Sequence, residues 1–225
     1  MYNNEKTAVT QLKEILKILR ENVIKYEVII CDDKSTDNSL NLIKENFKNE
    51  KALKILSNSE NRGIFKTINM LYGVASMEYI GLFSIDGDWY PKDIIKLLNT
   101  ASSTRADIVI GVRNNKHYSI YRSCISFLYN FLPLMFFGVQ TKDAGSIKIF
   151  KKKIFNAYTF VSHSVFCEAE FIIRTVMDNK LVVFTPIHFK KRIKKSGLGG
   201  RLNIAFSSFI DLLKLRFFLK GYNTH

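Results

Sequence analysis

Residues 79–88 read YIGLFSIDGD, an apolar run that ends in two aspartates separated by one glycine. Residues 79–85 lack the regular alternation of apolar and polar side chains that marks a half-exposed strand, so they predict a strand buried on both faces. Asp86 and Asp88 follow this run directly. In an open sheet of parallel strands, ligands bind beyond the carboxyl ends of the strands. We therefore expect both carboxylates to lie at a binding site.

The same arrangement recurs through the first half of the chain. One apolar run ends at Asp32 and Asp33, and another is followed by Arg113. Segments with helical spacing of apolar residues lie between the runs. The expected strands are 26–31, 52–57, 79–85 and 106–111, and the expected helices are 5–22, 35–47, 64–74 and 91–101. Alternating strands and helices predict an α/β fold with a doubly wound, mostly parallel sheet flanked by helices.

The second half is less regular in its pattern. We expect helices at 118–137, 168–179 and 202–219, with strands at 147–150 and 181–186. No linker rich in proline or glycine separates the two halves, so residues 1–225 are expected to form a single domain.

Composition limits the class of protein. The 225 residues are 47% hydrophobic, which is enough for one sizeable core, and the net charge is +14. A basic surface favours nucleic acid, anionic lipid or phosphorylated substrates, although many of the lysines can equally be solubilising residues. The three cysteines show no C-x-x-C spacing, which argues against a disulfide framework or a zinc site and favours a reducing compartment. The charged first 20 residues do not resemble a signal peptide.

Three short motifs carry the chemistry that we expect. Asp86 and Asp88 can share Mg²⁺ or Mn²⁺ with a diphosphate, because these hard ions prefer carboxylate and phosphate oxygens. By itself D-x-D is also a common turn, and its position after a buried strand favours the metal site. The segment 32–37 reads D-D-x-S-x-D, in which Ser35 or Asp37 can cap a helix while Asp32 or Asp33 points at a nucleotide. The third motif, 61–63, is a loop whose Gly63 permits close approach of a ligand.

In this order and spacing, the motifs resemble those of the family 2 glycosyltransferases with the GT-A fold. The resemblance extends to the polyprenyl-phosphate glycosyltransferases of the dolichol-phosphate mannose synthase-like branch. The residues that carry it are Tyr2-Asn3-Asn4-Glu5, D-D-x-S-x-D at 32–37, N-x-G at 61–63, D-x-D at 86–88, G-x-R at 111–113, R-x-x-x-S at Arg122 and Ser126, D-x-x-x-x-K at 143–148, and Pro186 with Arg192 and Ser196.

The resemblance implies an inverting, metal-dependent transfer of a sugar from a UDP- or GDP-sugar to polyprenyl phosphate, in cell-envelope glycan synthesis. It implies that Asp86, Asp88, Arg113 and Arg122 are catalytic, with the metal on Asp86 and Asp88. The donor would be bound by Tyr2, Asn4, Glu5, Asp32, Asp33, Asn61, Gly63 and Asp86, and the acceptor phosphate by Arg122, Ser126, Arg192 and Ser196. Arginine suits these roles because its planar fork of donors matches phosphate oxygens.

Several alternatives remain open. The acceptor can instead be a sugar hydroxyl of a cell-surface glycan, which would require a carboxylate base. Glu168 and Glu170 are the candidates, and as i, i+2 residues of one helix only one is expected to face inward. The chain can also be an inactive, truncated homologue. Nucleic-acid binding is the strongest non-enzyme alternative, because it would explain the net charge of +14. It is disfavoured because no nucleic-acid motif is present and the acidic strand ends would repel phosphates unless a metal intervened.

The chain departs from the family pattern at both ends. The family begins with an apolar strand before the Tyr2–Glu5 segment, and here Met1 stands at that point. We expect the sheet to lack this first strand, with either truncation of the chain or another segment or chain filling the place. The closing segment at Arg192–Ser196 is one residue short and lacks a glycine.

Membrane association is expected from two segments. Residues 123–141 carry no charge but contain Ser126, Asn130, Pro133 and Gln140, so they predict a buried or membrane-surface helix rather than a spanning one. The last helix combines phenylalanines with Lys214, and it can either lie on a membrane or pack on the domain. We expect a cytoplasmic protein, peripheral on the inner face of the membrane.

Overall fold

The computed structural model describes residues 1–114, 120–188, 190 and 202–222. Its helices are α1 (Ala8–Asn22), α2 (Ser39–Asn46), α3 (Ile64–Val74), α4 (Lys92–Thr104), α5 (Ile120–Phe137), α6 (Lys152–Asn156), α7 (Cys167–Met177) and α8 (Leu202–Tyr222). Its strands are β1 (Val28–Asp32), β2 (Leu53–Ser57), β3 (Tyr79–Leu82), β4 (Ile108–Arg113), β5 (Lys148–Lys151) and β6 (Val182–Ile187). The predicted α/β class is therefore confirmed.

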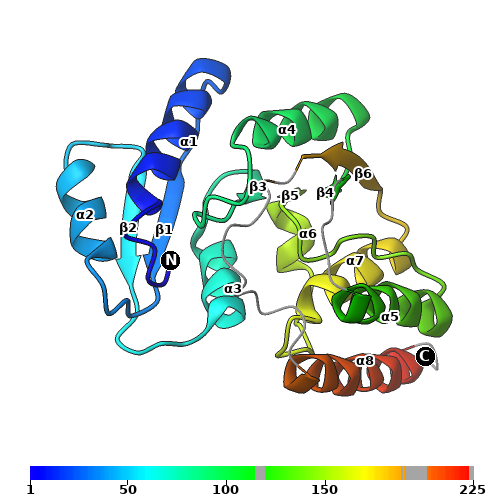
Figure 1. Ribbon diagram of the computed structural model, residues 1–225. Coiled ribbons are helices and arrows are strands. Elements are labelled where there is room, and N and C mark those ends of the chain that lie inside the picture. The colour runs from blue at the N-terminus through cyan, green and yellow to red at the C-terminus, as the bar shows by residue number, and fades with distance from the viewer. Residues whose placement is uncertain (115–119, 189, 191–201, 223–225) are drawn as a thin grey trace.

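The strands form two sheets instead of one (Figure 1). In the described residues, β1 and β2 pair in parallel, and a separate four-stranded sheet has the order β3-β5-β4-β6. The division lies between β1 and β3, and the sequence led us to expect that one strand would be missing from the sheet. The second sheet is mixed, because β5 runs antiparallel to both β3 and β4 while β4 and β6 are parallel. Sequence periodicity could not reveal this direction, since side chains alternate in the same way in both orientations.

Some predicted boundaries were wrong. The strand expected at 79–85 ends at Leu82, because β5 offers only the four partners from Lys151 back to Lys148. The helix expected at 35–47 begins at Ser39. The short helix α6 was not predicted.

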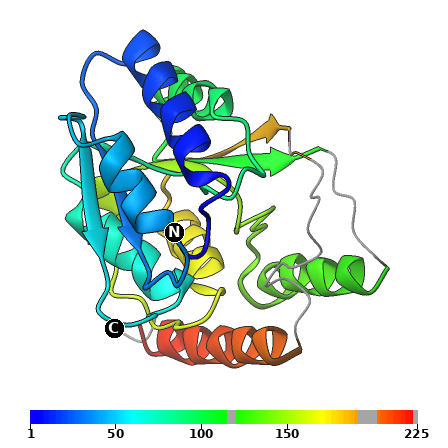
Figure 2. The same ribbon diagram turned by 60° about the vertical axis from the view of Figure 1, so that its left-hand side comes forward.

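Helices cover both faces of the four-stranded sheet (Figures 1 and 2). Along β4, Val109 packs with α4 residues such as Leu97, whereas Ile108 and Ile110 pack with α7 residues on the opposite face. This alternation is the two-residue period of a strand, here buried on both sides. Each fully buried isoleucine or leucine contributes about 1.5–3 kcal/mol. A third cluster joins α1 and α2 to β1.

Helices α5 and α8 lie side by side at the edge of the molecule that is farthest from α4 (Figures 1 and 2). Among the described residues, no helix combines the length and the apolar character needed to cross a bilayer.

Candidate functional site

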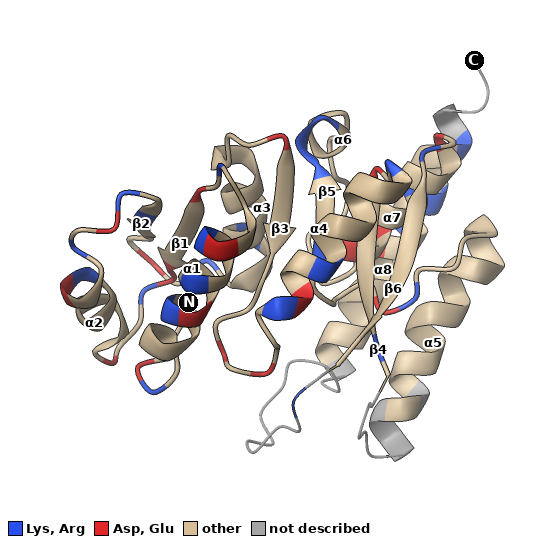
Figure 3. Ribbon diagram, turned by 90° about the horizontal axis from the view of Figure 1, so that it is seen from above, with Lys and Arg blue, Asp and Glu red and all other residues tan. Residues whose placement is uncertain are grey.

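The amino-terminal segment joins the two acidic strand ends. The backbone of Met1 accepts a hydrogen bond from the Asp33 amide (2.8 Å), which fixes this segment beside the end of β1. Six residues later, the Thr7 hydroxyl donates to the Ile85 carbonyl (3.1 Å), directly before the D-x-D turn. Figure 3 shows the loop between β3 and α4 with its acidic residues beside the amino terminus. Residues of the D-D motif at 32–33 and of the D-x-D motif at 86–88 are thereby brought to one region.

Asp32 organises the turn that follows β1. Its two carboxylate oxygens accept hydrogen bonds from the Ser35 amide (3.0 Å) and the Ser35 hydroxyl (2.5 Å). The residue is 3% exposed. Asp32 therefore holds the local backbone, and the expected contact with a nucleotide stays a prediction.

Asp33 holds the loop that contains the N-x-G motif. It accepts hydrogen bonds from Asn58 Nδ2 (2.7 Å), the amides of Arg62 and Gly63 (both 2.9 Å) and the Thr67 hydroxyl (3.1 Å). Burial alone would raise the pKa of Asp33, but these hydrogen bonds hold the pKa below its usual value. The D-D and N-x-G motifs are thus one structural unit, which their separation in the sequence did not reveal.

Gly63 is the residue at which this loop turns into α3. Its φ of 81° and ψ of 156° lie in a region that is essentially restricted to glycine. Asn61 accepts a hydrogen bond from the Gly63 amide through its side-chain oxygen (3.2 Å). The glycine requirement is therefore conformational, and it places the Gly63 amide against Asp33.

The N-cap residue of α2 is Asn38 and not Ser35 or Asp37, as the sequence suggested, and the Asn38 side chain makes no capping hydrogen bond; Asp37 lies one residue before it. Asp37 Oδ1 accepts from the Ser39 amide (3.0 Å) at the start of α2, and its Oδ2 accepts from the Glu5 amide (3.1 Å). Burial alone would raise the pKa of Asp37, but the hydrogen bonds from Ser39 and Glu5 lower it. Glu5 in turn accepts from the Asn38 amide (3.3 Å).

The other members of the amino-terminal motif lie on this framework. The Asn4 amide donates to the Ser39 hydroxyl (2.8 Å), and the Asn4 side chain accepts from the Tyr2 amide (3.2 Å). Tyr2 is 47% exposed. The segment is therefore held by its backbone while the Tyr2 ring faces solvent.

Asp86 and Asp88 lie on a tight turn. The Asp88 amide donates to Asp86 Oδ1 (3.2 Å), and Gly87 has φ 86°, which favours glycine. Both carboxylates are half-buried. The Asp88 carbonyl also accepts from the Lys190 amide (2.9 Å), which ties the turn to the segment after β6.

The donor set of this turn fits a divalent metal. Mg²⁺ and Mn²⁺ take carboxylate oxygens from one or two side chains and complete their shells with phosphate and water. No group of three or more His, Cys, Asp or Glu side chains suited to a metal occurs in the described part of the chain. Two carboxylates on one turn match such a partial protein site.

Arg113 is paired with a carboxylate that the sequence analysis had not assigned a role. Its Nε donates to Asp143 Oδ2 (2.9 Å), its terminal nitrogen pairs with Oδ1, and its backbone amide also donates to Asp143 (2.9 Å). The guanidinium carbon lies 5.5 Å from the centroid of the Trp89 ring, next to Asp88. Arg113 therefore connects β4, the Asp143 turn and the D-x-D turn. The D-x-x-x-x-K spacing was the sequence signal for Asp143.

Glu168 and Glu170 are both buried, so the expectation that only one faces inward was wrong. Helix α7 is buried around most of its circumference, which leaves no solvent side for the other residue. Glu168 pairs with the fully buried Lys148, whose ammonium also donates to the Ala144 carbonyl (2.7 Å). Glu170 accepts from the amides of Val161 (2.9 Å) and Ser162 (2.8 Å). Both carboxylates serve internal contacts.

The predicted acceptor residues are only partly described. Ser126 is half-buried on α5, and its carbonyl accepts from Asn130 Nδ2 (2.6 Å). Asn130 Oδ1 accepts from the Asp143 amide (3.3 Å), so α5 contacts the Asp143 turn. Arg122 lies on α5 but its side chain is outside the described part, as are Arg192 and Ser196.

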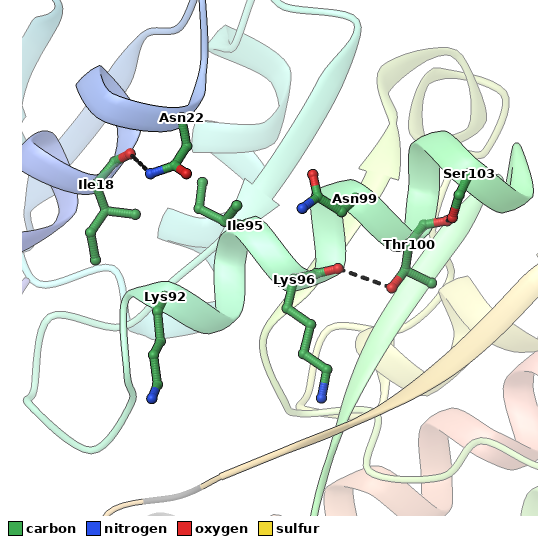
Figure 4. A pocket seen from close by; sticks show the side chains of 8 residues that line it. All are labelled: Ile18, Asn22, Lys92, Ile95, Lys96, Asn99, Thr100 and Ser103. Atoms are coloured by element: carbon green, nitrogen blue, oxygen red, sulfur yellow. Dashed lines mark hydrogen bonds between the residues drawn. The ribbon is translucent and has the colours of Figure 1, made fainter.

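A cavity of about 630 Å³ lies between α1 and α4 (Figure 4). Its lining contains no carboxylate, so it lacks the ligands that a metal-bound diphosphate needs. The lining residues are Ile18, Asn22, Lys92, Ile95, Lys96, Asn99, Thr100 and Ser103. We therefore place the candidate site at the acidic turns.

Comparison with solved structures supports the GT-A fold. Glucosyl-3-phosphoglycerate synthase from Mycobacterium tuberculosis, in complex with Mn²⁺, UDP and phosphoglyceric acid, matches with TM-score 0.73 and 12% identity over 96% of this chain and 76% of that one. A mannosyltransferase from Pyrobaculum calidifontis, in complex with GDP-Man and Mn²⁺, matches with TM-score 0.61 and 16% identity over 93% of this chain and 62% of that one. The predicted fold is confirmed.

Sequence relatives point to the same family. Dodecaprenyl-phosphate galacturonate synthase from Rhizobium johnstonii is 24% identical over 225 residues, which cover 98% of this chain and 65% of that protein. The alignment with a second curated relative covers 62% of that protein's length. The chain therefore spans less than two thirds of the length of each of these two relatives. The family model described as glycosyl transferase family 2 matches residues 1–158. The chain belongs to the family 2 glycosyltransferases.

Proposed function

We propose that this protein transfers a hexose from a UDP- or GDP-sugar to polyprenyl phosphate, with inversion at the anomeric carbon. The observation that carries the proposal is the position of the Asp86–Asp88 turn. Thr7 links this turn to the Tyr2–Glu5 segment, and the Glu5 amide links that segment to the Asp32–Asp37 turn. A donor binding there contacts both acidic strand ends. The relative that acts on dodecaprenyl phosphate supports the choice of acceptor.

In this proposal the donor nucleotide lies on the framework built by Asp33. Tyr2, Asn4, Glu5, Asp32, Asn61 and Gly63 surround or support that framework. Asp33 acts mainly by holding the 61–63 loop, since its oxygens accept four internal hydrogen bonds. The exposed Tyr2 ring offers an aromatic face to the base.

Asp86 and Asp88 would hold Mg²⁺ or Mn²⁺. When bound, the metal neutralises negative charge that develops on the departing nucleotide diphosphate. Gly87 allows the turn that presents both carboxylates, and the Lys190 amide fixes the backbone of Asp88. These contacts restrict the positions that the two carboxylates can take.

The acceptor phosphate requires no general base. One of its oxygens forms a bond to the anomeric carbon while the bond from that carbon to the nucleotide diphosphate breaks, and the electron pair leaves with the diphosphate. Attack opposite the leaving group inverts the anomeric configuration. An ionised phosphate has no proton to lose, which agrees with the internal engagement of Glu168 and Glu170. For this reason we favour a phosphate acceptor over a sugar hydroxyl.

The acceptor would approach from the edge formed by α5 and α8. Both helices carry exposed apolar side chains in addition to those that face the core. Lys214 and Lys220 are exposed on α8, and each basic residue near an anionic leaflet adds about 1 kcal/mol to binding. The exposed residues are Phe127, Leu128, Phe131, Leu134 and Met135 on α5, and Phe206, Phe209, Ile210, Phe217 and Phe218 on α8. We propose that this edge rests on the cytoplasmic face of a membrane, where the lipid phosphate lies.

Vesicle flotation tests this membrane contact. The protein should float with vesicles that contain anionic lipid, and the double variant Phe206→Ser, Phe217→Ser should float at least several-fold less, because both rings are exposed. Ile24→Ser is the matched control, since Ile24 is exposed on the α1–β1 side of the molecule. Equal flotation of the double variant and the control would argue against the α5–α8 edge.

The activity itself is tested with a panel of UDP- and GDP-sugars and Mg²⁺ or Mn²⁺, with polyprenyl phosphate, a saccharide or no acceptor. We expect a lipid-linked product only with polyprenyl phosphate, and a product with inverted anomeric configuration. Transfer to the saccharide alone would replace the acceptor that we propose. If no donor is transferred or hydrolysed, the chain is an inactive homologue.

A further inference from the structure

Two aromatic residues directly after the D-x-D turn each contact a cation. Trp89 and Tyr90 follow Asp88 in the sequence. The guanidinium carbon of Arg113 lies 5.5 Å from the centroid of the Trp89 ring. The ammonium of Lys190 lies 4.8 Å from the centroid of the Tyr90 ring. Both distances are within the range of cation–π contacts, so two positive charges stand next to the turn.

The two cations differ in how far their charge is neutralised. Arg113 forms an ion pair with Asp143, and these side chains are only 14% and 3% exposed. Lys190 forms no ion pair with any carboxylate among the residues that the structure describes. Lys190 is half-buried and Tyr90 is 36% exposed, so a ligand can reach both from solvent. Lys190 is therefore the cation next to the turn that is better placed to bind an anion.

The backbone holds Lys190 close to the expected metal ligands. Its amide donates a hydrogen bond to the Asp88 carbonyl (2.9 Å), and its flexible side chain then reaches the ring two residues beyond Asp88. An ammonium is a compact charge with three hydrogen-bond donors, and it binds phosphate oxygens as a point charge. A diphosphate that shares a metal with Asp86 and Asp88 would therefore lie within reach of Lys190.

A second lysine adds positive charge next to the same ring. The Lys92 ammonium lies 5.7 Å from the centroid of the Tyr90 ring, and Lys92 is exposed. Lys96 extends from the same side of α4, but its ammonium donates to the Pro186 carbonyl (Figure 4). Two ammonium groups near one ring repel each other, and a bound anion offsets that repulsion. Lys92 therefore favours an anion next to Tyr90.

The direction from which Lys190 reaches the turn indicates which phosphate it meets. The four-stranded sheet has the order β3-β5-β4-β6, and the sheet of β1 and β2 lies on the β3 side (Figure 1). In the proposed function the nucleoside lies near β1. Lys190 follows β6, at the opposite edge of the four-stranded sheet. It therefore approaches the phosphate that is farther from the nucleoside, which is the one that carries the sugar.

We propose that the Lys190 ammonium binds the sugar-bearing phosphate of the donor, which becomes the terminal phosphate of the departing nucleoside diphosphate. The inference rests on the proposed function, because it requires a diphosphate at the Asp86–Asp88 turn. Lys190 donates hydrogen bonds to the phosphate oxygens while the bond between the anomeric carbon and the diphosphate oxygen breaks and its electron pair passes to the diphosphate. Tyr90 is a positioning residue, since it acts through Lys190.

Titration calorimetry with UDP, GDP, UMP and GMP in the presence of Mn²⁺ tests the contact in the complete chain. Lys190→Gln should weaken binding of the preferred diphosphate about tenfold, the loss expected for one hydrogen bond from a charged group, and change binding of the matching monophosphate less than about twofold. Lys190→Arg keeps the charge and should bind the diphosphate more tightly than Lys190→Gln.

Lys153→Gln is the matched control for the loss of a lysine charge. Lys153 is exposed on α6, which follows β5. The last residue of β5, Lys151, pairs with Tyr79, the first residue of β3, so α6 lies at the end of the sheet opposite the D-x-D turn. Binding of the diphosphate to this variant should be unchanged.

Two variants of Tyr90 test whether the ring positions the ammonium. Tyr90→Phe keeps an aromatic face and should retain the affinity for the diphosphate, whereas Tyr90→Leu should lose affinity several-fold. Steady-state transfer gives a second readout. Lys190→Gln should raise KM for the donor and lower kcat, and leave KM for polyprenyl phosphate unchanged, because the contact is made with the donor and its leaving group.

The outcomes distinguish this inference from the proposed function. If Lys190→Gln binds the diphosphate as tightly as the original protein does, the inference is wrong and the proposed function stands. Equal weakening of diphosphate and monophosphate, or a rise only in KM for polyprenyl phosphate, also overturns the inference, since Lys190 then contacts a different group. If the original protein binds none of the four nucleotides, the proposed function and the inference both fail.

Discussion

Asp33 and Asp88 both follow strands near the amino-terminal segment, yet their surroundings differ. Asp33 is 5% exposed and accepts four hydrogen bonds from the residues after β2. Asp88 is half-buried on a glycine turn that Asp86 closes. A carboxylate surrounded by backbone amides holds the fold, whereas one on a half-exposed turn can bind a cation. The spacing of acidic residues thus predicts where a site lies, and their partners decide what each residue does.

The largest expected effect is on catalysis at Asp88. Asp88→Ala should lower transfer at least about 100-fold, or about 2.7 kcal/mol in the barrier, because the developing diphosphate charge loses metal support. Its melting temperature should stay close to that of the original protein. The measurement is transfer of radiolabelled sugar at saturating metal. Asp88→Asn keeps the shape of the side chain, and wild-type activity in that variant would contradict the metal role.

Asp33→Ala should show the opposite pattern, a loss of stability. Its removal leaves the buried donors of Asn58, Arg62, Gly63 and Thr67 without their acceptor, and we expect about 3 kcal/mol of destabilisation. Chemical denaturation measures the change. Asp33→Asn, which retains one acceptor oxygen, should lose less. If Asp33→Ala keeps full stability and loses only donor affinity, the contrast with Asp88 disappears.

Gly63→Ala tests the same loop through its backbone. The φ of 81° and ψ of 156° are strained for alanine, so we expect about 1–3 kcal/mol of destabilisation with a raised KM for the donor. Gly73→Ala is the matched control on the same helix. It meets no atom within 4 Å and should be neutral or stabilising by up to about 1 kcal/mol. Equal stability of the two variants would show that the loop relaxes.

The pH dependence of stability should be the smallest effect. The pKa values of Asp33 and Asp37 in the folded protein are lowered from 3.8. The stability that these two ionised carboxylates contribute to the fold is therefore complete at a pH above their unfolded-state pKa. It is lost as pH falls from about 5 through 3.8 and further toward the folded pKa. Denaturant titrations between pH 7 and pH 3 measure this loss, and Asp33→Asn should flatten it. A variant curve parallel to wild type would exclude Asp33 as a source.

Local pattern was sufficient for most of the elements. Helix α3 occupies Ile64–Val74 as predicted, because its apolar spacing and the glycine before it are both local signals. The strand at 79–85 was predicted too long, since its length depends on the four residues that β5 provides. A missing strand was expected, but neither the separation into two sheets nor the antiparallel direction of β5 was foreseen.

The site was predicted less completely than the fold. Asp143 was noted only within a motif, and the structure pairs it with Arg113 across 30 residues. Glu168 was considered as a base, but the buried Lys148 lies beside it. Such pairs depend on which segments meet in space, and no spacing along the chain encodes that.

Sequence patterns that extend over a few residues therefore established the α/β class, the order of the helices and strands, and the acidic residues at the strand ends. Apolar periodicity, glycine and strand-end polarity act over a few residues and can be recognised before folding. Tertiary structure alone decided that Asp33 supports a loop, that both α7 glutamates are internal, and that the Met1 backbone lies beside the end of β1. These outcomes depend on burial and on partners 8 to 30 residues away in the sequence. The contribution of a carboxylate contact to stability is set by the groups that replace water around it.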